Sequence, residues 1–261
     1  MNDLEELKEL LSVPRKIIIT THQRPDGDAM GSSLALYHYL QLKGHAATVI
    51  SPTDYPDFLS WMPGDNTVVN YEKEPLRSKE LVADAELIFC LDFNKLYRLE
   101  ELGKLIAQST ATKVLIDHHL EPDDFADFQM SRVSACSTAE LVYNFIVQSG
   151  DRELISKDIA SCIYTGILTD TDRFRIPTTT PAVHRIAAEL LEFGINHTQI
   201  YEAVYETFTE NRLRFFGYCI REKLEVIKEL KTGIICLETA DLKKFHIQSG
   251  DTEGVVNYPL W

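Results

Sequence analysis

The chain has 261 residues, of which 44% are hydrophobic and 25% are charged, an ordinary balance for a folded globular protein. A chain of this length can bury a large core without disulfides, so intrinsic disorder is disfavoured. The formal net charge is −14. This acidity argues against a protein that coats long duplex nucleic acid, because such proteins usually present a basic surface.

Cysteine usage and the start of the chain both indicate where the protein resides. The five cysteines are widely spaced and include no C-x-x-C pair, which is typical of reduced thiols in a reducing compartment. The first residues, MNDLEELKELL, are acidic and amphipathic, unlike a signal peptide. No apolar run approaches the roughly 18 residues of a membrane span. We therefore expect a cytoplasmic protein with no membrane partner.

The first 120 residues alternate between short apolar strands and amphipathic helices. We expect a helix over 3–12, a strand over 16–21, a helix over 29–43, strands over 46–51 and 86–92, a helix over 97–108 and a strand over 112–117. These strands are nearly continuous in apolar residues, as expected of strands that are covered on both faces. The pattern predicts an α/β fold with a parallel sheet.

The remainder of the chain is helical and then changes character. Helical spacing is present over 137–148, 157–168, 181–193, 196–205 and 211–223, and strand-like runs follow over 224–230 and 233–239. Residues 231–233 suit the turn of a hairpin. We therefore expect a first domain over 1–195, a helical linker over 196–220 and a second, smaller α/β piece over 221–261, which is too small to be a secure domain alone.

Acidic and histidine clusters follow the predicted strands and one helix. The clusters are His22 with Asp26 and Asp28, then Asp92, then Asp117 with His118 and His119, and finally Asp170 at the end of the helix over 157–168. Because the carboxyl ends of parallel strands meet at one edge of a sheet, the strand-end clusters should lie together. Asp26 and Asp28 are two residues apart, so an extended segment would direct both carboxylates to the same side.

Crowded carboxylates repel one another and need positive charge nearby. Two divalent cations balance four aspartates, and Mn²⁺ accepts both carboxylate and imidazole ligands. Two such metals can activate water and clamp a phosphoryl group. Each residue alone also has an ordinary explanation: Asp28 could cap a helix, Asp92 could start a turn, and the histidines could lie in a loop. Their joint placement favours a two-metal phosphoesterase site.

Four ordered motifs resemble those of the DHH phosphoesterase superfamily. They are THQRPDGDAMGSSLAL at 21–36, LDFN at 91–94, DHH at 117–119 and GILTDTDRFR at 166–175. The branch that the chain most resembles is the nano-RNase type, oligoribonucleases that are also 3′-phosphoadenosine-5′-phosphate phosphatases. The resemblance implies a parallel-sheet DHH domain with flanking helices, followed by the start of a smaller α/β DHHA1 domain. The segment at 250–260 resembles the opening of that substrate-binding domain.

The resemblance also implies a role for each matched residue. It implies that one manganese ion is held by His22 and Asp26, that a second is held by Asp28, His118 and Asp170, and that Asp92 bridges both. It further implies that His119 acts in catalysis, by contacting the scissile phosphate or protonating the leaving oxygen, and that Asp117 orients a ligand. Arg173 and Arg175, just past Asp170, could reach substrate phosphate, or they could instead be structural or solvated.

The sequence departs from the family at its C-terminal end, where the glycine-rich GGGH segment of DHHA1 domains is missing. We therefore expect an incomplete chain whose partner is a short RNA or a small nucleotide. The alternatives within the class are a cyclic-dinucleotide phosphodiesterase, a RecJ-like exonuclease and a pyrophosphatase-like enzyme, although a processive exonuclease would need a long basic channel. A non-catalytic nucleotide-binding module is the alternative from another class. The sequence leaves a homodimer open.

Overall fold

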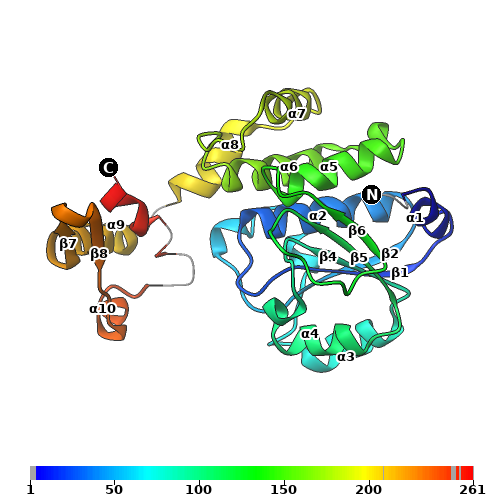
Figure 1. Ribbon diagram of the computed structural model, residues 1–261, viewed down its shortest axis with the longest axis horizontal. Helices are drawn as coiled ribbons and strands as arrows, with labels where there is room; N and C mark the ends of the chain where they lie inside the picture. Colours follow the sequence, from blue (N-terminus) through cyan, green and yellow to red (C-terminus); the bar gives the residue numbers. More distant parts are fainter. Residues whose placement is uncertain (1–3, 208, 248–250, 253, 261) are drawn as a thin grey trace. The chain divides into compact units, whose positions relative to one another are not determined.

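The computed structural model describes residues 4–207, 209–247, 251–252 and 254–260. The chain forms two compact units. The first comprises Met1–Asp54 with Leu59–Ile200, and the second comprises Tyr55–Phe58 with Tyr201–Trp261. A six-stranded sheet lies in the first unit and a two-stranded sheet in the second (Figure 1). The clusters of acidic and histidine side chains all belong to the first unit.

The six-stranded sheet is parallel throughout, which confirms the predicted fold class. Its strands are β1 Lys16–Thr20, β2 Ala46–Ser51, β3 Val69–Asn70, β4 Leu87–Leu91, β5 Thr112–Asp117 and β6 Phe128–Ser131. The spatial order is β3-β2-β1-β4-β5-β6, so the direction of winding reverses between β1 and β4. In open α/β sheets, ligands bind outside the carboxyl ends of the strands at such a reversal.

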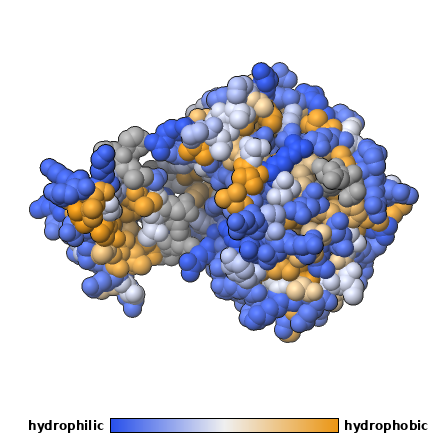
Figure 2. Space-filling view, viewed as in Figure 1, coloured by the Kyte–Doolittle hydropathy of each residue, from blue (hydrophilic) through white to orange (hydrophobic). Residues whose placement is uncertain are grey.

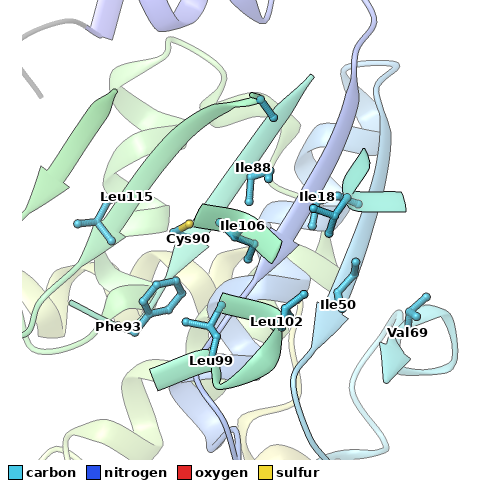
Figure 3. Packing of buried hydrophobic residues seen from close by; sticks show 12 residues of the cluster. Ile18, Ile50, Val69, Ile88, Cys90, Phe93, Leu99, Leu102, Ile106 and Leu115 are labelled. Atoms are coloured by element: carbon cyan, nitrogen blue, oxygen red, sulfur yellow. The ribbon is translucent and has the colours of Figure 1, made fainter. Parts of the chain in front are cut away.

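Helices cover both faces of this sheet (Figure 1). One face carries α2 Gly27–Leu42, α5 Thr138–Gln148 and α6 Lys157–Asp170, which pack against one another. The other face carries α3 Pro75–Asp84 and α4 Glu101–Gln108. Figure 3 shows the core on this second face, where strand residues such as Ile18 and Ile88 pack against Leu102 and Ile106 of α4. The first unit also contains α1 Leu4–Leu10, α7 Pro181–Glu192 and most of α8 His197–Tyr201.

Several sequence-based boundaries were wrong, and short elements account for most of the errors. The predicted helix over 97–108 is a 3₁₀ turn, Leu96–Leu99, followed by α4. The two-residue strand β3, the edge strand β6 and the mostly polar helix α3 were not predicted, because each has too few apolar residues for a clear periodicity. Residue 3, the first residue of the predicted helix over 3–12, lies outside the described residues.

The second unit is small and has its own core. It contains α9 Glu210–Tyr218, β7 Leu224–Ile227, β8 Thr232–Ile235 and α10 Thr239–Lys244, and β7 pairs with β8 as an antiparallel hairpin. The predicted strand over 224–230 is wrong beyond residue 227, where a 3₁₀ turn begins. Figure 2 shows hydrophobic residues at the surface around this hairpin, where Val226 and Leu230 are 59% and 69% exposed. The assignment of residues 221–261 to a DHHA1 domain stays a prediction.

No helix in the described part of the chain could span a bilayer.

Two glycines allow α2, α5 and α6 to approach closely. A Cβ atom on Gly31 of α2 would lie 2.5 Å from the carbonyl oxygen of Cys162 in α6. A Cβ atom on Gly166 of α6 would lie 2.5 Å from Cβ of Ala139 in α5 and 2.8 Å from Oδ1 of Asp28. The packing of these three helices therefore brings the start of α2, the start of α5 and the end of α6 to the same place.

We expect the Gly31→Ala substitution to lower the free energy of unfolding by about 1–3 kcal/mol, because backbone atoms of α6 would have to move. Gly217, in α9, is a matched control, since a Cβ atom there meets nothing within 4 Å. The Gly217→Ala variant should be neutral or more stable by about 0.5–1 kcal/mol, because alanine favours helix. Urea denaturation followed by circular dichroism compares the two variants. Equal stability of Gly31→Ala and the parent protein would contradict the close-packing account.

Candidate metal centre

All six residues predicted to bind metal lie together at the carboxyl edge of the first unit's sheet. Their possible ligand atoms fall into overlapping groups in which every atom lies within 4.8 Å of the others. The groups are His22 with Asp26 and Asp92, Asp28 with His118 and Asp170, and Asp92 with His118 and His119. His22 follows β1 and Asp92 follows β4, so the centre sits where the winding of the sheet reverses.

The first group presents one imidazole to two carboxylates. Nε2 of His22 lies 3.4 Å from Oδ2 of Asp92 and 3.9 Å from Oδ2 of Asp26. Nδ1 of His22 lies 2.7 Å from the carbonyl oxygen of Gln23 and can donate a hydrogen bond to it. Such a bond fixes the tautomer and leaves the lone pair of Nε2 for a cation, as in many histidine metal ligands.

The second group has the same arrangement around His118. Nε2 of His118 lies 3.5 Å from Oδ2 of Asp170 and 4.0 Å from Oδ2 of Asp28. Its Nδ1 lies 3.4 Å from the carbonyl oxygen of Ala135, again on the far side of the ring from the carboxylates. Asp170 is the last residue of α6, so the helix ends at the centre.

Asp92 lies between the two groups. Its Oδ2 faces His22, whereas its Oδ1 lies 3.5 Å from Nε2 of His118. The backbone of Asp92 has φ = 64°, in the left-handed region that few residues other than glycine adopt. Its N–H donates to the carbonyl oxygen of Ile116 at 3.2 Å, which ties the strained residue to β5. Strain of this kind often occurs at functional sites.

The geometry of the first motif differs from the prediction. Asp26 is the N-cap of α2, because its Oδ1 accepts hydrogen bonds from the N–H groups of Asp28 and Ala29. Asp28 therefore already lies in the helix, and the expectation of two carboxylates on the same side of an extended segment was wrong. The helical turn directs Asp26 towards the group of His22 and Asp28 towards the group of His118.

The charges of this centre fit divalent cations. Asp26, Asp28, Asp92 and Asp170 form no ion pair with lysine or arginine among the described residues. Burial, together with the charges of Asp92, Asp170 and Asp26, raises the pKa of Asp28 well above its ordinary value. Burial and the charge of Asp92 likewise raise the pKa of Asp170 to about 6, although His118 opposes the shift. Bound cations would remove this repulsion, and carboxylate with imidazole suits metals such as Mn²⁺.

Protonation of the histidines can offset part of the negative charge when no metal is bound. Burial alone would lower the pKa of His118, but its hydrogen bond with Asp92 and the charges of Asp92 and Asp170 raise it to about 9. Burial alone would raise the pKa of Asp92, yet His118 and His22 outweigh burial and hold that pKa well below its usual range. Cations that bind here must therefore displace protons.

Asp117 and His119 form a separate pair beside the centre. Nδ1 of His119 lies 2.7 Å from Oδ1 of Asp117 and 3.8 Å from Oδ1 of Asp92. Asp117 is fully buried at the end of β5, and its Oδ2 has no hydrogen-bond partner among the described residues. His119 is about one-third exposed. A buried carboxylate thus orients a histidine that faces both solvent and the cluster.

The two arginines predicted to contact substrate instead bind an aspartate of their own loop. Nη2 of Arg173 lies 2.8 Å from Oδ1 of Asp172, and Nη2 of Arg175 lies 2.5 Å from Oδ2 of the same carboxylate. Asp172, Arg173 and Phe174 all have positive φ, so the chain makes a left-handed turn that begins two residues after Asp170. A role for Arg173 and Arg175 in substrate binding stays a prediction.

Sequence reasoning missed the start of α5 as part of the centre. The N–H groups of Thr138 and Ala139 donate to Asp28, at 2.6 Å to Oδ2 and 2.9 Å to Oδ1. The hydroxyl of Thr138 donates to Oδ1 of Asp92 at 3.0 Å. The sequence does signal a helix start here, since Ser137 is a typical N-cap residue and Glu140 follows three residues later; the Ser137 side chain accepts a hydrogen bond from the N–H of Glu140. Nothing in that signal indicates what the helix end would face.

Comparison with known proteins identifies the family to which the chain belongs. Residues 16–167, more than half of the chain, match the DHH family, N-terminal domain. The chain belongs to the DHH family of phosphoesterases. A solved structure titled as an exopolyphosphatase-related protein from Bacteroides fragilis is 40% identical, with a TM-score of 0.96, and the match covers 99% of this chain and 76% of that one.

Two curated relatives are named for activities on nucleotides. The bifunctional oligoribonuclease and PAP phosphatase NrnA of Thermus thermophilus is 34% identical over 192 residues, which covers 73% of this chain and 54% of that protein. The cyclic-di-AMP phosphodiesterase PdeA of Listeria monocytogenes is 26% identical over 182 residues, which covers 67% of this chain and 27% of that protein. The chain thus spans about half the length, or less, of these relatives.

Proposed function

We propose that this protein hydrolyses short oligoribonucleotides and 3′-phosphoadenosine-5′-phosphate with the help of two divalent metal ions, most suitably Mn²⁺. The observation that carries the proposal is the arrangement of six potential ligands in two groups of three, with Asp92 placed between His22 and His118. The name of the Thermus relative supports this substrate class over others within the family.

The ligand roles follow from the two groups. His22 and Asp26 would hold one metal, Asp28, His118 and Asp170 would hold the other, and Asp92 would contact both. When bound, the two cations would activate water and offset the charge that develops on the phosphoryl group. The hydrogen bonds of His22 to Gln23 and of His118 to Ala135 keep both Nε2 atoms available as ligands.

His119 is the proposed proton donor. Its Nδ1 is held by the buried Asp117 carboxylate, so a proton on Nε2 would be free to move to the oxygen that leaves phosphorus. Other hydrolases likewise use a carboxylate to orient a catalytic histidine, and here the hydrogen bond between Nδ1 of His119 and Asp117 would fix the imidazole ring.

Arg24 is better placed than Arg173 or Arg175 to contact substrate phosphate. It lies between His22 and Asp26, its side chain is exposed, and its guanidinium has no ionic or hydrogen-bond partner among the described residues. Its backbone, at φ = 52°, is held by a hydrogen bond from its N–H to Oγ1 of Thr53 at 2.7 Å. A fixed backbone with an unpaired cation beside the proposed metal ligands suits a phosphate contact.

We expect Arg24→Ala to raise KM for a diadenylate about tenfold or more, because a charge-assisted hydrogen bond contributes roughly 1.5–3 kcal/mol. Turnover at saturation should change less than KM. Arg77→Ala is the control, since Arg77 lies on α3 in an exposed pair with Glu74. Steady-state kinetics on both variants measures the difference. An unchanged KM in Arg24→Ala would exclude the phosphate contact.

A substrate panel tests the proposed function itself. The protein would be assayed with Mn²⁺ on linear di- and triribonucleotides, 3′-phosphoadenosine-5′-phosphate, cyclic di-AMP and a long duplex. We expect the linear di- and triribonucleotides and 3′-phosphoadenosine-5′-phosphate to be hydrolysed at least tenfold faster than cyclic di-AMP and the duplex. Faster turnover of cyclic di-AMP would favour the activity named for the Listeria relative. Tight nucleotide binding without any turnover would favour a non-catalytic module.

A further inference from the structure

Thr138, in the first turn of α5, contacts a carboxylate from each of the two proposed metal groups. Its N–H donates to Oδ2 of Asp28 at 2.6 Å, and its hydroxyl donates to Oδ1 of Asp92 at 3.0 Å. The residue is fully buried. Through its backbone N–H and its hydroxyl, Thr138 therefore links Asp28 on α2 to Asp92 after β4, although neither residue is near it in the sequence.

The start of α5 explains why Thr138 can make both contacts. The first N–H groups of a helix have no carbonyl partner within the helix, and here those of Thr138 and Ala139 donate to Asp28. The positive end of the helix dipole also favours the carboxylate. Ser137 caps the helix through the N–H of Glu140, so its own hydroxyl is engaged elsewhere. The hydroxyl of Thr138 is thus the side-chain donor that reaches Asp92.

Packing holds Thr138 in place. Ala139 lies against Gly166, where a Cβ atom would come within 2.5 Å of the alanine methyl carbon, so α5 cannot shift towards α6. The β-branched threonine side chain has restricted rotation about its first bond. The donor to Asp92 therefore has little freedom, which is what a precise ligand geometry requires of its supporting residues.

We propose that Thr138 is a positioning residue that fixes the Asp92 carboxylate between the two metal groups and couples the orientation of Asp92 to that of Asp28. This role rests on the proposed metal centre, and it means that a residue that is not itself a metal ligand sets the orientation of one of the ligands. The hydroxyl occupies one acceptor position of Oδ1. The carboxylate plane is thereby set, with Oδ2 towards His22 and Oδ1 towards His118. Residues that orient metal ligands in this way typically change metal affinity 10–100-fold when they are replaced.

Thr138→Val removes the hydroxyl but keeps the branched shape and the N–H that donates to Asp28. We expect Mn²⁺, titrated by calorimetry and by electron paramagnetic resonance, to bind at least tenfold more weakly to at least one site of this variant. Thr138→Ser keeps the hydroxyl and should restore affinity to within about threefold of the parent protein. With a saturating metal concentration, kcat should fall in Thr138→Val while KM changes little.

A second pair of variants and a control variant distinguish the loss of carboxylate positioning from a general loss of stability. Thr138→Ala and Thr138→Ser both lack the methyl group, so the comparison isolates the hydroxyl even if valine perturbs the fold. Thr165→Val removes another fully buried threonine hydroxyl, one that donates to the carbonyl oxygen of Ser161 at 2.8 Å. It should leave Mn²⁺ affinity unchanged.

The outcomes distinguish this inference from the proposed function. Parent protein that binds no Mn²⁺ would overturn the metal centre itself. Parent protein that binds two Mn²⁺ ions, with Thr138→Val and Thr138→Ala binding them equally well, would overturn only the role of Thr138. Loss of affinity in Thr138→Ser equal to that in Thr138→Ala would also overturn it, because the hydroxyl would then be irrelevant.

Discussion

The Asp92→Asn variant is expected to lose roughly 10³-fold or more in kcat/KM on short oligoribonucleotides, a loss of about 4 kcal/mol in transition-state stabilisation. Asparagine has nearly the same shape and tolerates the left-handed backbone at φ = 64°. It can also still accept the hydrogen bond from Thr138. The loss would therefore report the missing negative charge between His22 and His118 rather than a distorted loop.

The measurement pairs kinetics with metal stoichiometry. Asp92→Asn should bind fewer than two Mn²⁺ ions per chain at concentrations that fill both sites of the parent protein. Asp84→Asn is the control, because Asp84 lies at the end of α3 in an exposed pair with Lys16. That control should retain full activity and stoichiometry. A loss in Asp92→Asn of no more than twofold would rule out a bridging role.

Removal of metal should have the second large effect, on both activity and stability. A chelator should lower activity at least 100-fold. Metal at 100 times its dissociation constant stabilises a protein by about 2.7 kcal/mol per site. For a domain of 150–250 residues, each kcal/mol raises Tm by about 2–4 °C. Full activity after exhaustive chelation would contradict the metal mechanism altogether.

The metal-free protein should also become less stable as the pH rises. The folded state raises the pKa of Asp170 from 3.8 to about 6 through burial and the charge of Asp92. It raises the pKa of His118 from 6.5 to about 9, because the hydrogen bond and the negative charge of Asp92 outweigh burial, which alone would lower this pKa. Both shifts mean that the folded state binds more protons than the unfolded state. The free energy of unfolding therefore falls as the pH rises from 3.8 to about 6, because of Asp170, and from 6.5 to about 9, because of His118.

Chelated protein should therefore melt at a lower temperature at pH 9 than at pH 6. Added Mn²⁺ should reduce or reverse this trend, because deprotonated ligands bind the cation more tightly. Calorimetric melting curves at a series of pH values, with and without metal, measure both effects. Asp170→Asn should flatten the dependence between pH 4 and pH 6. A metal-free Tm that rises steadily from pH 6 to pH 9 would contradict the electrostatics described for this cluster.

The sequence predicted the parallel sheet and the membership of the cluster, but not its internal geometry. Strand-end placement is robust because the apolar runs at 16–20, 87–91 and 112–116 specify buried parallel strands whatever packs on them. The three strands became neighbours around the reversal of winding, so His22, Asp92 and His118 had to meet.

What the sequence could not supply depends on contacts between distant segments. Asp26 and Asp28 face different groups because α2 begins at Gly27, two residues before the predicted start at residue 29, so the two carboxylates are not in an extended segment. Thr138 faces Asp28 and Asp92 only because α5 packs against α6 at Gly166. Arg173 and Arg175 bind Asp172 because the chain turns left-handed after Asp170. None of these contacts has a periodic or compositional signature.

Anomalous diffraction from crystals soaked in Mn²⁺ would show whether two cations share Asp92. We expect two anomalous peaks in each chain. One would be bound by His22 and Asp26, the other by Asp28, His118 and Asp170, and both would contact the carboxylate of Asp92. A single peak, or two peaks of which only one touches Asp92, would contradict this expectation.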